Sequence, residues 1–293
     1  MYVIVGSTGH IGSVVARKLL EHGKKVRVIA RDASRMQTLT ELGAEAMAGS
    51  LFDTDFLYHA FQGSTAVFTI IPGDIRADDM MRHMDTIGGS ISTALRMSHA
   101  SHVVNISSIG AENIEGTGPI AGLHRQEERL NQMEDCNVLH LRPSYFMENF
   151  LNNIPVIKYM GINGSPIRGD LQIAMNATRD IGAAAAERLL SLDFKDKSFF
   201  DLMGPQDLTM NEATKILGAA IGKPDLSYVQ FSFEDAENGM IQAGISPNVA
   251  SNYNEMAKAL NEGLVHPAPR TPENTTHTSL EEFAHSVFAP AFG

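Results

Sequence analysis

Short β-branched segments alternate with longer segments of helical period along the first half of the chain. This alternation is typical of a parallel sheet that is covered by helices on both faces. Between the predicted strands, apolar stripes of helical period stop at Gly23, Gly43 and Gly63, which predicts short amphipathic helices. A longer helix is expected over residues 78–98. The predicted strands are Tyr2–Val5, Val26–Ala30, a segment near Ala46, Ala66–Ile71, His102–Ser107 and Asn137–Leu141.

The second half of the chain has a weaker pattern. Residues 144–176 are rich in Asn, Gly, Pro and Met, which predicts loops and short elements over a binding cleft. Two later helices are expected to begin at sequences with capping-box spacing, Thr209–Glu212 and Ser279–Glu282. The other expected elements are helices over residues 180–192, 233–244 and 248–263 and strands at Ser198–Met203 and Leu226–Ser232. These scattered elements predict a smaller lobe that closes over the end of the sheet.

Three glycines follow the first predicted strand with the spacing G-x-x-G-x-x-G, directly before the first helix. Glycine lets the chain turn sharply and lets its backbone approach a pyrophosphate, while the helix N-terminus offers free N–H groups and partial positive charge. A glycine-rich turn without a ligand is the alternative, but a position between strand and helix is the context that the motif requires. The turn therefore predicts a dinucleotide site, with contacts from Gly6, Ser7, Thr8, Gly9, His10, Ile11 and Gly12.

The position of this motif at the start of a βαβ unit indicates the fold class. We expect an α/β protein with a Rossmann-type doubly wound parallel sheet and a smaller C-terminal α/β substrate lobe. The pattern suggests residues 1–150 for the dinucleotide-binding domain and residues 151–293 for the lobe. Residues 178–204 are expected to pack back on the first domain.

Two arginines follow the second predicted strand, where proteins that prefer NAD carry an acidic residue for the ribose 2′-hydroxyl. Arg31 ends the strand, and Arg35 lies one helical turn further on. Guanidinium groups suit a 2′-phosphate, because they form bidentate, charge-assisted hydrogen bonds. NADP(H) is therefore favoured over NAD(H) as the cofactor. Two alternatives stay open: Asp32 could serve a 2′-hydroxyl, and both arginines could be solvated surface charges.

The charge and cysteine content narrow the classes of partner. The chain has 23 Lys and Arg against 34 Asp and Glu, a net charge of −11, which argues against nucleic acid and anionic membrane surfaces. A single cysteine, Cys136, rules out an intramolecular disulfide framework and favours a reducing compartment, so a cytoplasmic protein is expected. The histidines lack paired metal-ligand spacing, and no metal site is predicted.

Other cofactor contacts are expected where the third, fourth and fifth strands end, because ligands of doubly wound folds bind outside the carboxyl ends of the strands. Small residues and prolines also end strands that bind nothing, so this assignment rests on position alone. The candidates are Ser50, Leu51, Ile70, Ile71, Pro72, Ser107 and Ser108.

Several motifs spread over almost the whole length resemble the NmrA-like family of atypical short-chain dehydrogenases. The most specific is Leu141-Arg142-Pro143 followed by Phe146-Met147-Glu148-Asn149; others are the glycine turn, Ser107–Ala111, Arg179–Gly182 and Gly244–Ser246. The resemblance implies NADP(H) binding, with Pro143, Tyr145 and Phe146 at the site. The family includes NADPH-dependent quinone oxidoreductases and regulators that bind NADP(H) without turnover, so membership indicates the fold better than the function.

One feature of typical short-chain dehydrogenases is missing. They use a Tyr-x-x-x-Lys pair as proton donor, and this chain has no tyrosine between Tyr58 and Tyr145. His124 stands where family members often carry the lysine, and a histidine can donate a proton at neutral pH. A helix-start histidine that bonds local backbone is the alternative. The candidate catalytic residues are His124 and Tyr145.

The missing acid favours an acceptor that takes hydride readily, because a reduced quinone delocalises its charge into the ring. We therefore expect an NADPH-binding reductase of a quinone-like or other small conjugated acceptor. Tyr145 and Phe146 would wall off a flat acceptor. Further apolar lining could come from Phe150 and from Met147, Met160 and Met175, which could equally be core residues. The alternative function is a redox sensor that binds NADP(H) without chemistry, and a second copy or a regulatory protein are the partners left open.

Overall fold

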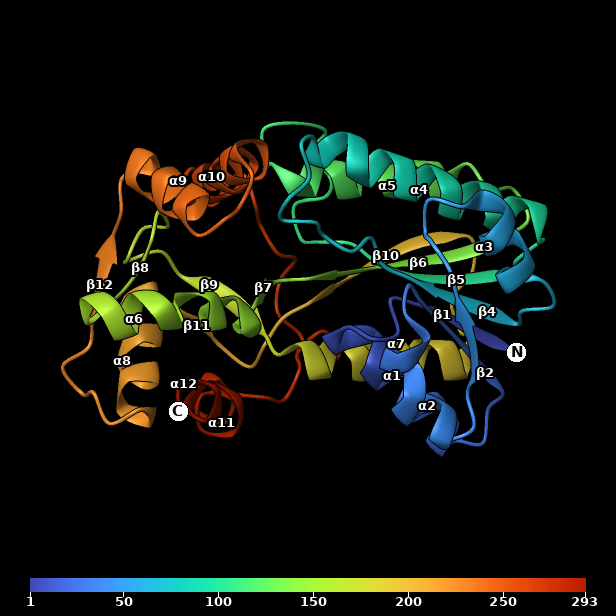
Figure 1. The fold of residues 1–293 in the computed structure, drawn as a ribbon, viewed down its shortest axis with the longest axis horizontal. Helices are drawn as coiled ribbons and strands as arrows, with labels where there is room; N and C mark the ends of the chain where they lie inside the picture. Colours follow the sequence, from blue (N-terminus) through green and yellow to red (C-terminus); the bar gives the residue numbers. More distant parts are fainter.

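A seven-stranded parallel sheet forms the centre of the computed structural model, which describes residues 1–293. The strand order is β10-β6-β5-β4-β1-β2-β3 (Figure 1). The order reverses between β1 and β4, which is the point where doubly wound sheets bind their ligands. The expected doubly wound α/β fold is thus confirmed. The strands are β1 Tyr2–Val5, β2 Val26–Ala30, β3 Glu45–Ala48, β4 Ala66–Thr69, β5 His102–Ile106, β6 Asn137–Pro143 and β10 Lys197–Leu202.

Six helices cover the two faces of this sheet (Figure 1). One face carries α1 His10–Glu21, α2 Gln37–Glu41 and α7 Thr178–Ser191. The other face carries α3 Thr54–Phe61, α4 Met80–Met97 and α5 Pro119–Asn131. The first helix shows why: its residues Ile11, Val15 and Leu19 recur every four positions and are buried on the sheet. Each face has its own apolar core, of 23 and 21 buried residues.

The last strand and the last helix of this layer come from far along the chain. β10 pairs with β6 as far as Leu202 opposite Pro143, which is why β6 runs two residues beyond the predicted end at Leu141. α7 lies against α1, where Gly182 permits close approach, because a Cβ there would lie 2.8 Å from the Cβ of Val14. The segment between β6 and α7 belongs to the other part of the molecule.

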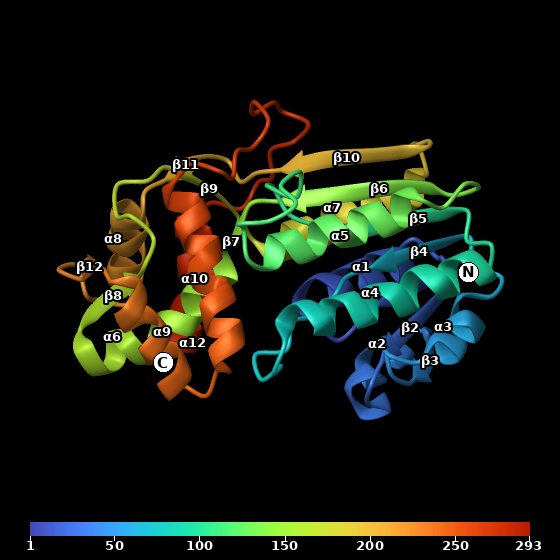
Figure 2. The same ribbon diagram turned by 90° about the horizontal axis from the view of Figure 1, so that it is seen from above.

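The second lobe contains all elements outside this layer and has a core around Phe150, Phe283 and Phe288 (Figure 1). Seen from above, α10 stands at the boundary between the lobe and the sheet (Figure 2). The strands of the lobe are β7 Tyr145–Phe146, β8 Ile162–Ser165, β9 Ile173–Asn176, β11 Asp207–Leu208 and β12 Ser227–Gln230. Its longer helices are α6 Ile154–Met160, α8 Met210–Ala220, α9 Phe233–Gln242 and α10 Pro247–Asn261, and the C-terminal segment consists of α11 Leu280–Phe283, η3 Ala284–Phe288 and α12 Ala289–Phe292.

The two predicted capping boxes have different outcomes. Thr209 and Glu212 form a complete box at the start of α8. At the start of α11 the hydroxyl of Ser279 accepts from the backbone N–H of Glu282, but the carboxylate of Glu282 binds Arg179 instead of turning back. The helix therefore has the N-cap hydrogen bond of Ser279 but lacks the reciprocal bond of a capping box. None of the helices combines the length and apolarity needed to cross a bilayer.

Candidate active site

The turn after β1 has a shape that only glycine permits at two of its three motif positions. Gly6 has φ +68°, and a Cβ there would lie 2.8 Å from the side chain of Ile70. A Cβ on Gly12 would lie 2.4 Å from the carbonyl oxygen of Gly6, closer than real contacts allow. The motif therefore brings the first turn of α1 directly against the preceding turn.

The N-terminus of α1 has no partner inside the protein. Gly9 is the N-cap and offers no side chain, and the first turn carries no acidic residue. Thr8 is half-buried, while Gly9 and His10 are exposed around the turn. Free N–H groups and the positive end of a helix dipole, left open to solvent, fit the pyrophosphate of a dinucleotide.

Two predicted contacts in this turn have structural roles instead. The side chain of Ser7 is fully buried, and its hydroxyl donates to the carbonyl of Ile29 in β2 at 3.0 Å. Ile11 is buried in the core beneath α1. Neither side chain is free to touch a ligand, so Ser7 anchors the turn to the neighbouring strand and Ile11 anchors the helix to the sheet.

The two arginines after β2 are exposed, and neither forms an ion pair with a carboxylate. The side chain of Asp32 accepts hydrogen bonds from the hydroxyl and the backbone N–H of Ser34, which lower the pKa of its carboxyl. Asp32 thus caps the short helix η1 Ala33–Met36. Arg31 and Arg35 are therefore exposed cations without a direct ion pair, although the carboxylate of Asp32 attracts Arg35 electrostatically.

The ends of β3 and β4 contribute less than expected. The hydroxyl of Ser50 accepts from the backbone N–H of Phe52 at 3.2 Å, so it is engaged within its own turn. Ile71 is buried in the core, and Ile70 packs against the glycine turn. Leu51 is half-buried and Pro72 is exposed. Of the five residues, only Ile71 is buried, and Pro72 is the most exposed.

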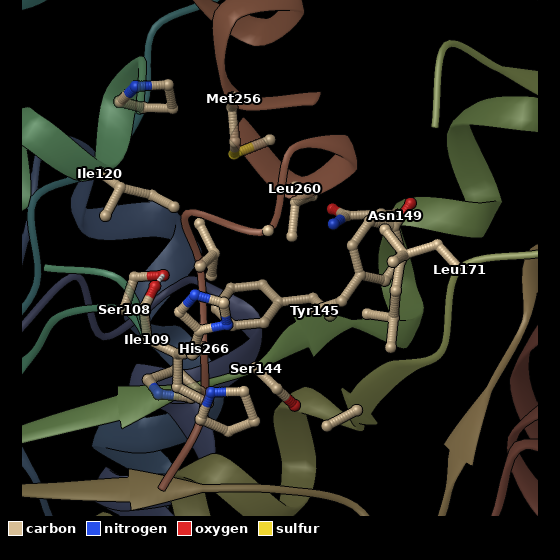
Figure 3. Close-up of a pocket in the computed structure, with 18 of the residues that line it drawn as sticks. Ser108, Ile109, Ile120, Ser144, Tyr145, Asn149, Leu171, Met256, Leu260 and His266 are labelled. Carbon is tan, nitrogen blue, oxygen red and sulfur yellow. Dashed lines mark hydrogen bonds between the residues drawn. The ribbon is translucent and has the colours of Figure 1, made fainter. Parts of the chain in front are cut away.

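A pocket of about 430 Å³ opens where β5 and β6 end, between the sheet and the second lobe (Figure 3). Five predicted residues line it: Ser107, Ser108, Pro143, Tyr145 and Phe146. The opposite wall comes from α10 and from the chain that follows it. Apolar side chains in the walls include Ile109, Ile120, Leu123, Ile173, Met256 and Leu260.

Polar groups inside this pocket are few. The hydroxyl of Ser107 is buried and has no hydrogen-bond partner, whereas the hydroxyl of Ser108 donates to the backbone carbonyl of Ile109. Burial raises the pKa of Tyr145, with a further contribution from Tyr228. Tyr145 therefore stays protonated and can donate a hydrogen bond, but it is not a tuned acid. The hydroxyl of Ser107, a buried donor without a partner, therefore indicates a position where a ligand binds.

The structure separates the two predicted catalytic residues. His124 lies away from the pocket that contains Tyr145: its Nδ1 donates to the carbonyl of Ala111 at 2.8 Å, and its ring lines a second, polar cavity of about 210 Å³. The structure thus places His124 outside the pocket that Tyr145 lines and favours the alternative of a histidine that bonds local backbone. Its neighbour Leu123 points into the main pocket, because consecutive helix residues lie about 100° apart around the axis.

The second cavity also contains a buried neutral histidine. His140 donates from Nε2 to Asn131 at 3.0 Å and accepts at Nδ1 from the amide of Asn105 at 3.2 Å. Burial lowers the pKa of His140 to about 4. The ring is therefore a structural link between β5, β6 and α5.

The motif over residues 141–149 also contains side chains that hold the elements around the pocket in place. Arg142 forms two hydrogen bonds to Glu127, from Nε at 2.9 Å and from Nη2 at 2.6 Å. The carboxylate of Glu148 accepts from both the N–H and the hydroxyl of Thr178 and so fixes the start of α7. The predicted lining residues Met147, Phe150 and Met175 are buried in the core of the second lobe, and Met160 is exposed, so none of them lines the pocket.

Six polar pocket residues were not predicted as site residues from the sequence: Ser144, Asn149, Gln172, Asp207, Tyr253 and His266. Asn149 belongs to the motif that includes Phe146, so its proximity to the cleft could have been inferred. Gln172 and His266 lie in segments without periodicity. Nothing local marks them as site residues.

A family of proteins described as NAD(P)H-binding matches residues 6–164, more than half of the chain. The chain belongs to this NAD(P)H-binding family. Among its relatives, the NAD(P)H azoreductase of Xenophilus azovorans is 28% identical over 299 residues, which cover 100% of this chain and 99% of the relative. The resemblance drawn from the motifs is thereby confirmed at the level of the family.

Solved structures agree with this assignment of an NAD(P)H-binding fold. The NADPH-dependent quinone oxidoreductase from Escherichia coli, complexed with NADPH, is similar with a TM-score of 0.83 and 20% identity over 98% of this chain and 100% of that one. Triphenylmethane reductase from Citrobacter sp., complexed with NADP(H), has a TM-score of 0.76 and 20% identity, covering 98% of this chain and 96% of that one. The similarity to these structures therefore includes the second lobe as well as the sheet.

Proposed function

We propose that this protein is an NADPH-dependent reductase that transfers two electrons to a quinone-like or other small conjugated acceptor. The observation that carries the proposal is the pocket of about 430 Å³ at the carboxyl ends of β5 and β6. Its volume falls within the range of small-molecule sites, about 300–1,000 Å³, and it lies at the edge of the sheet where doubly wound folds bind their ligands. The predicted cofactor contacts Ser107 and Pro143 line the same pocket, so a nicotinamide bound there would lie beside the acceptor.

The residues on the dinucleotide side fit NADPH. The uncapped start of α1 would hold the pyrophosphate, and the close approach of Gly12 to Gly6 leaves the backbone open to it. Arg31 and Arg35, which form no direct ion pair, would hold the 2′-phosphate. When bound, the reduced nicotinamide supplies two electrons and a proton as a hydride.

The residues on the acceptor side suit a flat, apolar molecule. Ile109, Ile120 and Leu260 exclude water from one end of the pocket, and Tyr145 presents an aromatic ring at another. The unpartnered hydroxyl of Ser107 would donate to an oxygen or nitrogen of the acceptor. No tyrosine and lysine pair is present to activate an isolated ketone, so a conjugated acceptor that disperses its own charge is favoured.

The relatives point to the same class of molecule. An azoreductase, a quinone oxidoreductase and a triphenylmethane reductase are named for acceptors with extended conjugation. These names support the acceptor class proposed for this chain.

Oxidation of NADPH, followed by its absorbance with a panel of quinones, tests the proposal. We expect turnover with at least one quinone. Leu260→Trp should fill the pocket and lower turnover while NADPH affinity is retained, whereas Leu264→Trp should act as wild type, because that side chain is 43% exposed and lies outside the pocket. Tight NADPH binding without oxidation by any acceptor would refute the reductase and favour a redox sensor.

A further inference from the structure

His266 occupies a fixed position in the pocket wall although it lies in an irregular segment. The carbonyl of Leu264 accepts from the side-chain amide of Asn113 at 3.0 Å, and the N–H of Ala268 donates to the carboxylate of Asp201 at 2.7 Å. Between these two tethers, Val265 packs against Gly110. The sheet layer thus holds the chain on both sides of His266 and aims its ring at the pocket (Figure 3).

The imidazole of His266 is exposed and makes no hydrogen bond within the protein. This distinguishes it from His124 and His140, whose ring nitrogens bond the backbone or neighbouring amides. An imidazole in a pocket wall that is free of hydrogen bonds within the protein can reach both solvent and a ligand, and histidine is a common proton donor in enzymes.

The other titratable groups in the pocket cannot supply a proton near neutral pH. Burial raises the pKa of Tyr145 and of Tyr253. Asp207, on β11, is bound to Arg270. The walls from α5, from the end of β5 and from β9 contribute no ionisable side chain. His266 is therefore the one group in this pocket suited to act as an acid.

We propose that His266 is the proton donor to the acceptor. The inference rests on the proposed reductase function and names its missing acid. An acceptor that has received a hydride from NADPH carries one excess negative charge on a conjugated oxygen or nitrogen. The imidazolium N–H bond breaks, a new O–H or N–H bond forms on the acceptor, and the neutral imidazole regains its proton from water.

The need for this donor depends on the acceptor. A reduced quinone spreads its charge into the ring and can take a proton from solvent. A reduced azo bond leaves the charge on one nitrogen, which is a far stronger base, so a positioned acid speeds its reduction more. A general acid typically contributes about 100-fold or more to the rate.

The test compares His266→Gln with the matched control His285→Gln, an exposed histidine in the C-terminal helical segment away from the pocket. Reduction of menadione and of a small azobenzene by NADPH is measured from about pH 5 to about pH 8. We expect His266→Gln to lower kcat for the azo acceptor about 100-fold, with a smaller effect on menadione and a flattened pH profile. The control should retain wild-type rates.

A second measurement does not depend on turnover. Diethyl pyrocarbonate modifies free imidazoles, and mass spectrometry locates the modified residues. We expect His266 and His285 to react in the free protein, and menadione to protect His266 alone. Unchanged azo reduction and pH profile in His266→Gln, or no protection by menadione, would overturn the donor role while the reductase function stands. If wild type reduces neither acceptor, the reductase function fails and the donor role fails with it.

Discussion

Breaking the ion pair between Arg142 and Glu127 should cost much more stability than breaking the second contact that Arg142 makes. The side chains of Arg142 and Glu127 are only 10% and 6% exposed. Removing Arg142 leaves the buried carboxylate of Glu127 without its ion-pair partner, which costs about 3–5 kcal/mol. Glu112 contacts the same guanidinium at 3.2 Å but is 51% exposed, so Glu112→Gln should cost less than about 1 kcal/mol.

A double-mutant cycle measured by urea unfolding checks this difference. Arg142→Met should lose about 3–5 kcal/mol, and Glu127→Met should lose less because Glu112 still contacts the guanidinium. The double variant should stay within about 1 kcal/mol of wild type, because an apolar pair of similar volume needs no desolvation. Circular dichroism follows the transition, and equal m-values confirm that the unfolded states are comparable. If the double variant lost as much as the two single variants together, the two charges would not be coupled and the reasoning would be refuted.

Three further predictions concern the cofactor turn and the pH dependence of stability. Arg31→Asp should weaken NADPH binding about tenfold or more, the equivalent of one charge-assisted hydrogen bond, and should spare NADH; equal NADPH affinity in a titration would exclude a 2′-phosphate contact. Gly12→Ala forces a Cβ against the Gly6 carbonyl, so NADPH binding should be lost with the circular dichroism spectrum retained, and wild-type affinity would contradict the close approach. Burial lowers the folded-state pKa of His140 to about 4, so unfolding takes up a proton and stability should fall by up to about 3 kcal/mol as pH drops from about 6.5 to about 4. His140→Gln should remove this component of the urea midpoint shift, and an unchanged pH slope would contradict it.

The glycine turn could be predicted from the sequence because its geometry is local. The shape of the turn depends on residues six positions apart, Gly6 and Gly12, and the free N–H groups belong to the helix that starts there. The directions of the side chains within the turn could not be predicted from the sequence. Ser7 points into the core because the carbonyl of Ile29, on a different strand, is there to accept its hydroxyl.

The pocket between the sheet and the second lobe was harder to predict, because it is assembled from distant segments. Whether His124 or Leu123 faces the pocket depends on how α5 is rotated against the sheet, and a one-residue difference changes the cavity that is reached. His266 is placed by Asn113 and Asp201, which lie more than sixty residues before it in the chain. Pairings of this kind leave no periodicity in the sequence.

The course of the chain between β6 and α7 has a consequence for how such proteins can diversify. β7 pairs with β9, with Tyr145 opposite Met175 and Phe146 opposite Asn176, and the side chain of Asn176 accepts from both the N–H and the hydroxyl of Ser144. The segment 145–176, which lies in the second lobe, therefore begins and ends at neighbouring points of the sheet layer. Such an insertion can be lengthened or exchanged at little cost in chain entropy, since its ends already meet. Changes in residues 145–176 outside the buried core positions would therefore alter the wall of the pocket and leave the glycine turn unchanged.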